Sequence, residues 1–157
     1  MFLAIDPGTH DFGYALFNLQ GILQRSGAFH MTKYGDWLAR IDKVVALVLI
    51  LQRYFGVQSV AIEMPSNFGN AASSGQSILK LMGCVMALRQ ALQSKGACVR
   101  LVPVLEWKGS LPKAVTTRRV RQKYGWKGKS LDEADAIGIG DYVLQTQQRR
   151  ISKRRVS

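Results

Sequence analysis

Four carboxylates of this sequence stand where they can do chemistry together. Asp6 follows a short apolar run and precedes Pro-Gly, and Glu63 follows a second apolar run at 60–62. Asp132 and Asp135 are three positions apart, which places both on one face of a helix. If the two runs are neighbouring strands and the helix docks across them, the four carboxylates converge. Such charges repel one another without a cation, and oxygen-only ligands favour Mg²⁺ or Mn²⁺.

Two such ions about 4 Å apart activate a water and stabilise the leaving oxygen of a phosphodiester. Each acid also has a purely local explanation. Asp6 stands before Pro-Gly, where aspartate is a common turn residue, and acids in the first turn of a helix favour its dipole. Glu63 is the hardest to explain locally, because it lies between an apolar run and Met-Pro. Taken singly, the acids leave both explanations open.

The basic residues point to a polyanionic partner. The chain has 157 residues and a formal net charge of +12. The stretch 108–129 contains no acid, and its eight basic residues are Lys108, Lys113, Arg118, Arg119, Arg121, Lys123, Lys127 and Lys129. A basic face of this kind is typical of proteins that bind nucleic acid. The alternatives are a merely basic protein and one that binds anionic lipid. Trp107 and Trp126 flank basic residues and either pack or stack on bases, and packing is favoured.

Hydrophobic periodicity predicts an α/β fold in a single domain at 1–146, followed by a basic, mobile tail at 147–157. Strands are expected at 1–6, 13–18, 23–31, 57–63 and 99–104, the first three as an antiparallel meander. Helices are expected at 34–55, 75–95, 113–124 and from 131 to about 145. The helix at 75–95 is apolar on more than one face, so we expect it to pack on its own sheet and on a second subunit as well.

Cys84 and Cys98 lack metal-ligand spacing and lie in apolar stretches, so we expect buried free thiols in a reducing cytosol. No apolar run reaches the roughly 20 residues of a membrane helix, and the N-terminus has no signal-peptide pattern. These features predict a cytoplasmic protein, in a bacterial cell or a phage-infected host, with no membrane partner.

Three segments of the chain resemble the motifs of the RuvC family, within the RNase H-like superfamily. Residues 5–14, IDPGTHDFGY, are similar to its opening aspartate-Pro-Gly turn with Gly-Tyr on the next strand. Residues 60–63, VAIE, resemble its second motif, in which a strand delivers a glutamate. Residues 132–136, DEADA, resemble its last motif. The order and rough spacing agree across most of the chain, and the short basic form is compatible with a phage enzyme.

The resemblance implies an RNase H-like mixed five-stranded sheet, with three antiparallel strands followed by parallel ones and helices on both faces. It implies an endonuclease that cuts four-way (Holliday) junctions by paired symmetric nicks. Two Mg²⁺ ions would be held by Asp6, Glu63, Asp132 and Asp135, with Asp6 shared. Lys108 and Lys113 match, more loosely, lysines that touch the phosphate near the cut. Phe68 matches an aromatic that meets opened bases, and simple loop packing is an equal alternative. The helix at 75–95 matches the helix of a homodimer.

Other functions remain open on the sequence alone. A flap or general branch nuclease and an RNase H-type nuclease have the same fold. A DNA-binding protein that has lost its chemistry is a further alternative, although all four acids are present. An Asp-x-Gly-Thr turn also opens the actin-like ATPases and sugar kinases, but 157 residues are too few for their two domains. We therefore expect no nucleotide cofactor.

Overall fold

The computed structural model describes residues 1–65 and 75–154. Its five strands form one sheet in the order β3-β2-β1-β4-β5. Their bounds are β1 Phe2–Asp6, β2 Asp11–Phe17, β3 Leu23–His30, β4 Ser59–Met64 and β5 Cys98–Pro103. The pairs β1–β2 and β2–β3 are antiparallel, and the pairs β1–β4 and β4–β5 are parallel. The predicted mixed five-stranded sheet is confirmed.

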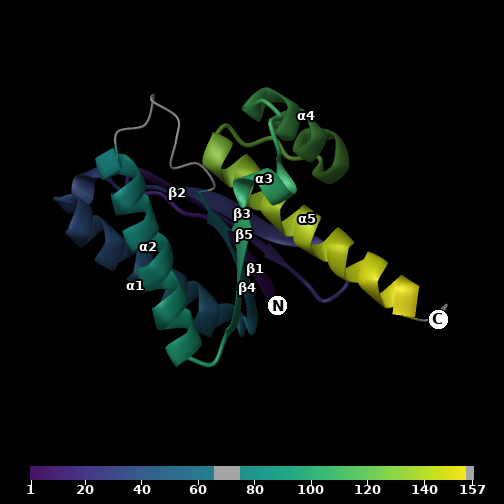
Figure 1. The fold of residues 1–157 in the computed structure, drawn as a ribbon, viewed down its shortest axis with the longest axis horizontal. Helices are drawn as coiled ribbons and strands as arrows, with labels where there is room; N and C mark the ends of the chain where they lie inside the picture. The colour runs from purple at the N-terminus through teal and green to yellow at the C-terminus, as the bar shows by residue number, and fades with distance from the viewer. Residues whose placement is uncertain (66–74, 155–157) are drawn as a thin grey trace.

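The helices lie in two layers, one on each face of the sheet (Figure 1). They are the 3-10 turn η1 Thr32–Tyr34, α1 Trp37–Phe55, α2 Gly75–Ser94, α3 Val104–Trp107, α4 Lys113–Tyr124 and α5 Leu131–Arg154. One layer holds α1 and α2, and the other holds α5 with α4 packed on it. In the described part of the chain, no helix is long and apolar enough to cross a membrane.

Alternation along the strands divides the buried side chains between two cores. Leu3 and Ile5 of β1 point to the α1–α2 side, where they meet Val44, Leu88 and other apolar residues. Phe2 and Ala4 of the same strand point to the α5 side, together with Ala61 of β4 and Ile137 of α5. The parity of a strand residue therefore decides which helical layer its side chain meets.

Helix α1 begins and ends where its capping residues dictate. The side chain of Asp36 accepts a hydrogen bond of 2.9 Å from the backbone N–H of Ala39, so the helix begins at Trp37 and not at Tyr34 as expected. Gly56 ends it in the left-handed conformation, at φ 60°.

Two further expectations need correction, and one element was not expected. Helix α5 does not end near 145 but continues to Arg154, because the glutamines and basic residues after Tyr142 are good helix formers and no Gly or Pro interrupts them. Cys84 is buried as expected, but Cys98 is exposed because it is the first residue of the edge strand β5. The short helix α3, which carries Trp107, was not expected.

Candidate active site

Two of the four predicted carboxylates stand side by side at the ends of parallel strands. Asp6 is the last residue of β1, and Glu63 lies at the same end of β4. The β1–β4 register pairs Ile5 with Ile62, so its continuation places Asp6 next to Glu63. Because side chains alternate along a strand, both carboxylates point to the α5 side of the sheet.

The first turn of α5 brings the other two carboxylates to the same end of the sheet. The backbone N–H of Glu133 donates a 3.3 Å hydrogen bond to Ser130 Oγ, which fixes where the helix starts. Gly13 of β2 lets this turn approach the sheet, since a Cβ there would stand 2.1 Å from the backbone oxygen of Asp132. Ser26 of β3 adds a 2.6 Å hydrogen bond from its hydroxyl to Glu133 Oε1. Asp132 and Asp135 are therefore set by backbone packing as well as by sequence spacing.

All four carboxylates line one cavity of about 530 Å³, together with Lys108 and Lys113. The Pro7–Asp11 turn and residues of α2 complete its wall. Sequence spacing predicted this convergence of the acids. The two lysines, assigned more loosely, lie at the same cavity.

The lysines act as counter-charges inside this group of acids. Lys108 Nζ lies 2.9 Å from Asp135 Oδ2, and both side chains are almost fully buried. Lys113 Nζ lies 3.6 Å from Asp135 Oδ2 and 3.7 Å from Asp132 Oδ1. Burial alone would lower the pKa of Lys113, but the nearby carboxylates of Asp135, Asp6 and Asp132 raise it above its ordinary value.

Two carboxyl groups are pushed toward the neutral form. Burial, and then the charges of Glu63, Asp135 and Asp132, raise the pKa of Asp6 well above its ordinary value. Burial, together with the charge of Asp135, raises the pKa of Glu63 to about 7, although a hydrogen bond from Trp107 and the charges of Lys108 and Lys113 oppose the shift. The lysines thus offset only part of the repulsion among the acids.

The donor set fits a hard divalent cation. It consists of carboxylate oxygens only, and Asp135 Oδ1 is buried with no hydrogen-bond partner among the described residues. As the side chains stand, no three His, Cys, Asp or Glu residues within 1–65 and 75–154 are arranged to hold a metal ion. The ammonium groups of Lys108 and Lys113 instead lie among these carboxylates, where they offset part of the negative charge that a bound cation would neutralise.

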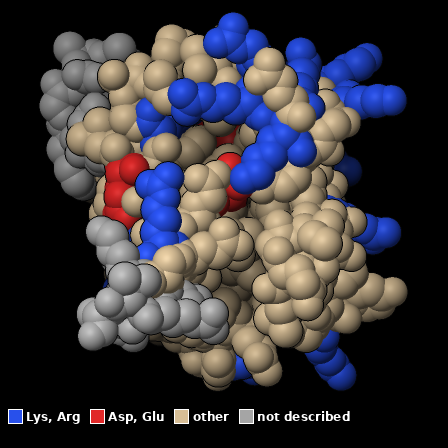
Figure 2. Space-filling view, turned by 90° about the vertical axis from the view of Figure 1, so that its right-hand side faces the viewer, with Lys and Arg blue, Asp and Glu red and all other residues tan. Residues whose placement is uncertain are grey.

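The remaining predicted DNA-binding residues lie outside this cavity, on and after α4. The structure places them on the molecular surface; they are Arg118, Arg119, Arg121, Lys123, Lys127 and Lys129. Lys123 pairs with Asp141 of α5, and the guanidinium of Arg121 lies over the buried ring of Trp126. Figure 2 shows Lys and Arg side chains that project along the upper edge of one face of the molecule. Phe68 lies outside the described residues.

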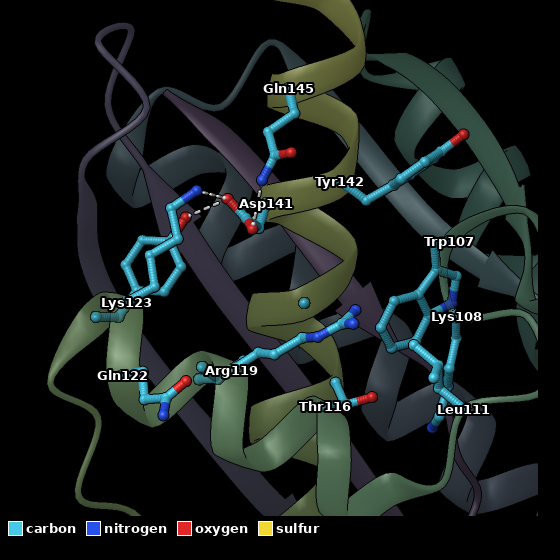
Figure 3. A pocket seen from close by; sticks show the side chains of 13 residues that line it. Trp107, Lys108, Leu111, Thr116, Arg119, Gln122, Lys123, Asp141, Tyr142 and Gln145 are labelled. Carbon is cyan, nitrogen blue, oxygen red and sulfur yellow. Dashed lines mark hydrogen bonds and ion pairs between the residues drawn. The ribbon is translucent and has the colours of Figure 1, made fainter.

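A second cavity, of about 550 Å³, lies between α4 and α5. Its acid, Asp141, is fully bonded: Oδ1 accepts from Lys123 Nζ and from the Tyr124 hydroxyl at 2.7 Å, and Oδ2 accepts from Gln145 Nε2 at 2.8 Å. Figure 3 shows Lys123 and Gln145 directed at Asp141, with Trp107 on the opposite side of the cavity.

Sequence reasoning missed the contact that Trp107 makes. Its indole N–H donates a 2.9 Å hydrogen bond to Glu63 Oε2. The position of Trp107 directly before Lys108 was the one signal that placed it near the site. The packing favoured for Trp126 agrees with its burial.

The sheet order, the two helical layers and the acids at the strand ends define an RNase H-like α/β fold with a carboxylate-lined cavity. No protein-family model matches the chain. The crossover junction endodeoxyribonuclease RuvC of Cytophaga hutchinsonii is 32% identical over 108 residues, which are 67% of this chain and 50% of that protein. The chain thus spans about half the length of the curated relative that it matches.

Solved structures agree with this fold. RuvC of T. thermophilus in complex with a Holliday junction substrate has a TM-score of 0.73 at 21% identity, over 90% of each chain. The Fowlpox virus resolvase with Holliday junction DNA has a TM-score of 0.65 at 14% identity, over 93% of this chain and 99% of that one. The yeast mitochondrial Holliday junction resolvase also has a TM-score of 0.65, at 16% identity, over 95% of this chain and 80% of that one. The predicted resemblance is confirmed, and the chain is RuvC-like in sequence and in fold.

Proposed function

We propose that the chain is a metal-dependent, structure-selective DNA endonuclease that resolves four-way junctions by paired symmetric nicks. The observation that carries the proposal is the convergence of Asp6, Glu63, Asp132 and Asp135 on one cavity with two lysines. The sequence similarity to a crossover junction endodeoxyribonuclease and the basic surface of α4 support DNA as the substrate.

In this proposal the four carboxylates hold two Mg²⁺ ions, for which Mn²⁺ substitutes, with Asp6 shared between them. When bound, the ions supply activation of the attacking water and positive charge for the leaving oxygen. The four carboxylates would bind the ions, and so place their positive charge, at the ends of β1 and β4. Once the acids are compensated, Lys108 and Lys113 are available to contact the backbone phosphate near the cut.

The basic residues of α4 and the segment after it provide the remaining affinity. They are exposed, and α4 begins at Lys113 in the wall of the cavity, so they suit contacts to the phosphates of the junction arms. Phe68 remains a prediction for the contact with opened bases. Such phosphate contacts position a duplex without reading its sequence.

We also propose that the protein works as a homodimer through α2. Leu79 and Met86 are 69% and 45% exposed, and their spacing of seven residues places them on one face of the helix. Cys84, Val85 and Leu88 of the same helix are buried against the sheet. A two-fold pair would set two cavities on opposing DNA strands. Sedimentation should give a dimer, and the double variant Leu79→Glu, Met86→Glu should give a monomer that nicks only one strand. A wild-type monomer that makes paired nicks would exclude this interface.

The test of the nuclease is a substrate panel. Purified protein is incubated with labelled four-way junction, flap, duplex and RNA–DNA hybrid, in Mg²⁺ or in EDTA, beside Asp6→Asn. We expect paired symmetric nicks on the junction, only with Mg²⁺, and none by the variant, which still binds.

Each rival function gives a different pattern in this panel. Equal cutting of flaps indicates a general branch nuclease, and cutting of the hybrid alone indicates an RNase H-type enzyme. Junction binding without cutting in Mg²⁺ or Mn²⁺ indicates a binding protein and contradicts the proposal.

A further inference from the structure

Trp107 connects the two cavities that flank α5. Its ring lines the second cavity, while its indole N–H donates the 2.9 Å hydrogen bond to Glu63 Oε2 in the first. In Figure 3 the ring stands beside α5 at the level of Lys108, and Arg119 reaches toward it from α4. Trp107 therefore contacts α5 through its ring and the Glu63 carboxylate of β4 through its N–H, so the position of α5 can fix that of Glu63.

Contacts with two other elements hold the short helix that carries Trp107. Glu106, the residue before it, accepts hydrogen bonds at Oε1 from Arg100 of β5 and from the Tyr142 hydroxyl of α5, the latter at 2.8 Å. Because these hydrogen bonds hold α3 against both the sheet and α5, the backbone that carries the Trp107 indole is fixed in place. A donor on a held backbone orients its acceptor better than a mobile one does.

Gly138 of α5 leaves the space that the Trp107 ring occupies. It lies three residues after Asp135 on α5, and a Cβ at this position would stand 2.8 Å from Trp107 Cζ3 and 3.2 Å from Thr116 Cγ2. Any larger residue would push the ring away from the helix. The same α5 segment thus provides a cavity carboxylate and the space that lets Trp107 reach Glu63.

We propose that Trp107, seated on Gly138, is a positioning residue that fixes the Glu63 carboxylate relative to Asp135. This inference rests on the proposed metal-dependent function and adds a residue to that site. A free glutamate side chain loses rotamer freedom when it binds a cation, and a carboxylate already held in place loses less. A hydrogen bond to one carboxylate oxygen leaves the other oxygen available to a cation.

A matched pair of sites allows the test. Trp126 is buried where Trp107 is half-buried, and its indole Nε1 has no hydrogen-bond partner among the described residues. Gly128 gives it room as Gly138 does for Trp107, because a Cβ there would stand 2.5 Å from that nitrogen. Trp107→Phe and Gly138→Ala are therefore compared with Trp126→Phe and Gly128→Ala.

The first measurement is Mn²⁺ binding by calorimetry, with the Mg²⁺ dependence of junction cutting alongside. Loss of an outer hydrogen-bond partner of a metal ligand typically weakens metal affinity by about tenfold or more. We expect Trp107→Phe and Gly138→Ala to raise the Mn²⁺ Kd by about that factor, with junction affinity in EDTA unchanged. The two control variants, Trp126→Phe and Gly128→Ala, should bind Mn²⁺ with the same Kd as the wild type.

The second measurement is the set of indole N–H signals in a ¹H–¹⁵N spectrum, assigned with the Trp→Phe variants. Glu63→Gln should shift the Trp107 signal and leave that of Trp126 in place. Substoichiometric Mn²⁺ should broaden the Trp107 signal more strongly than that of Trp126. These signals report on the bond itself, whatever a variant does to stability.

The outcomes separate this inference from the function on which it rests. If the wild type binds Mn²⁺ and cuts junctions, but Trp107→Phe matches Trp126→Phe in Kd, Trp107 only packs and the inference is wrong. A Trp107 signal unmoved by Glu63→Gln also overturns it. A wild type that binds no Mn²⁺ overturns the proposed function, and the positioning role with it.

Discussion

Two aspartates of α5 show how differently one helix can surround a carboxylate. Asp141 accepts hydrogen bonds from Lys123, Tyr124 and Gln145, so both of its oxygens are paired. Asp135, six residues earlier, pairs through Oδ2 with Lys108, while its Oδ1 is buried without a partner in the described part of the chain. Four other carboxylates line the cavity of Asp135, those of Asp6, Asp11, Glu63 and Asp132, and no other carboxylate lines that of Asp141.

The difference separates an acid with a structural role from one that suits the proposed metal site. The half-buried carboxylate of Asp141 is paired with Lys123 and Tyr124 of α4, so it stabilises the packing of α4 on α5. A buried acceptor left unpaired among like charges costs stability, and such arrangements concentrate at functional sites. The metal site proposed at Asp135 accounts for that cost, since a divalent cation would pair the free oxygen and offset the repulsion.

The largest expected contrast is between Asp135→Asn and Asp141→Asn. Asp135→Asn removes a proposed metal ligand, so junction cutting in Mg²⁺ should fall by about 10³-fold or more, as when a principal catalytic group is lost. Its free energy of unfolding in EDTA should also fall, because the buried Lys108 loses its carboxylate partner. Asp141→Asn should cut normally and lose about 1 kcal/mol of stability. Cutting assays and urea denaturation measure both, and equal loss of cutting in the two variants would remove the contrast.

The lysine partners sharpen the comparison. The side chains of Lys108 and Asp135 are 10% and 4% exposed, whereas those of Lys123 and Asp141 are 50% and 23% exposed. Removal of one partner of a buried pair costs about 3 kcal/mol, and an exposed pair contributes less than about 1 kcal/mol. Lys108→Met should therefore destabilise the metal-free protein more than Lys123→Met does. Chemical denaturation in EDTA tests this, and the reverse order would contradict it.

The pH dependence of stability tests the repulsion directly. The pKa of Glu63 is about 7 in the folded protein, against 4.5 for an ordinary glutamate, so the folded state holds more protons between these values. The free energy of unfolding in EDTA should therefore fall as pH rises from about 4.5 to 7, on the order of 1–2 kcal/mol. Glu63→Gln should reduce this fall. Denaturation curves across that range measure it, and a stability that rises with pH in the variant and the wild type alike would contradict the account.

The smallest expected effect concerns the basic surface of α4. Arg118 is exposed with no acidic partner among the described residues, whereas Lys123 is engaged by Asp141. Arg118→Ala should weaken junction binding a few-fold and reduce the salt slope of log K by about 1. Lys123→Ala should change the slope less. Binding titrations at several salt concentrations decide between them, and identical slopes would show that pairing with Asp141 does not withhold Lys123 from DNA.

Local signals account for most of what the sequence predicted. Gly56 marks the end of α1, and Ser130 marks the start of α5. The acids at 6 and 63 follow apolar runs whose parallel pairing placed them side by side. These features depend on neighbours in the chain or on simple strand alternation, so they can be read without a structure.

Part of what the sequence did not predict depends on contacts between distant residues. The Trp107–Glu63 hydrogen bond joins positions 44 apart, and the Ser26–Glu133 bond joins positions 107 apart. The exposure of Cys98 follows from β5 being an edge strand, which composition does not reveal. The roles assigned to the site residues, the extent of the domain and the mobility of the tail stay predictions.

The central claim is that Asp135 and the carboxylates that share its cavity form a metal site, whereas Asp141 does not. Calorimetric titration of Mn²⁺ into the wild type, Asp135→Asn and Asp141→Asn tests it most directly. The account predicts saturable binding by the wild type and by Asp141→Asn, and its loss in Asp135→Asn. Binding by Asp135→Asn with the affinity of the wild type, or no binding by any of the three proteins, would contradict it.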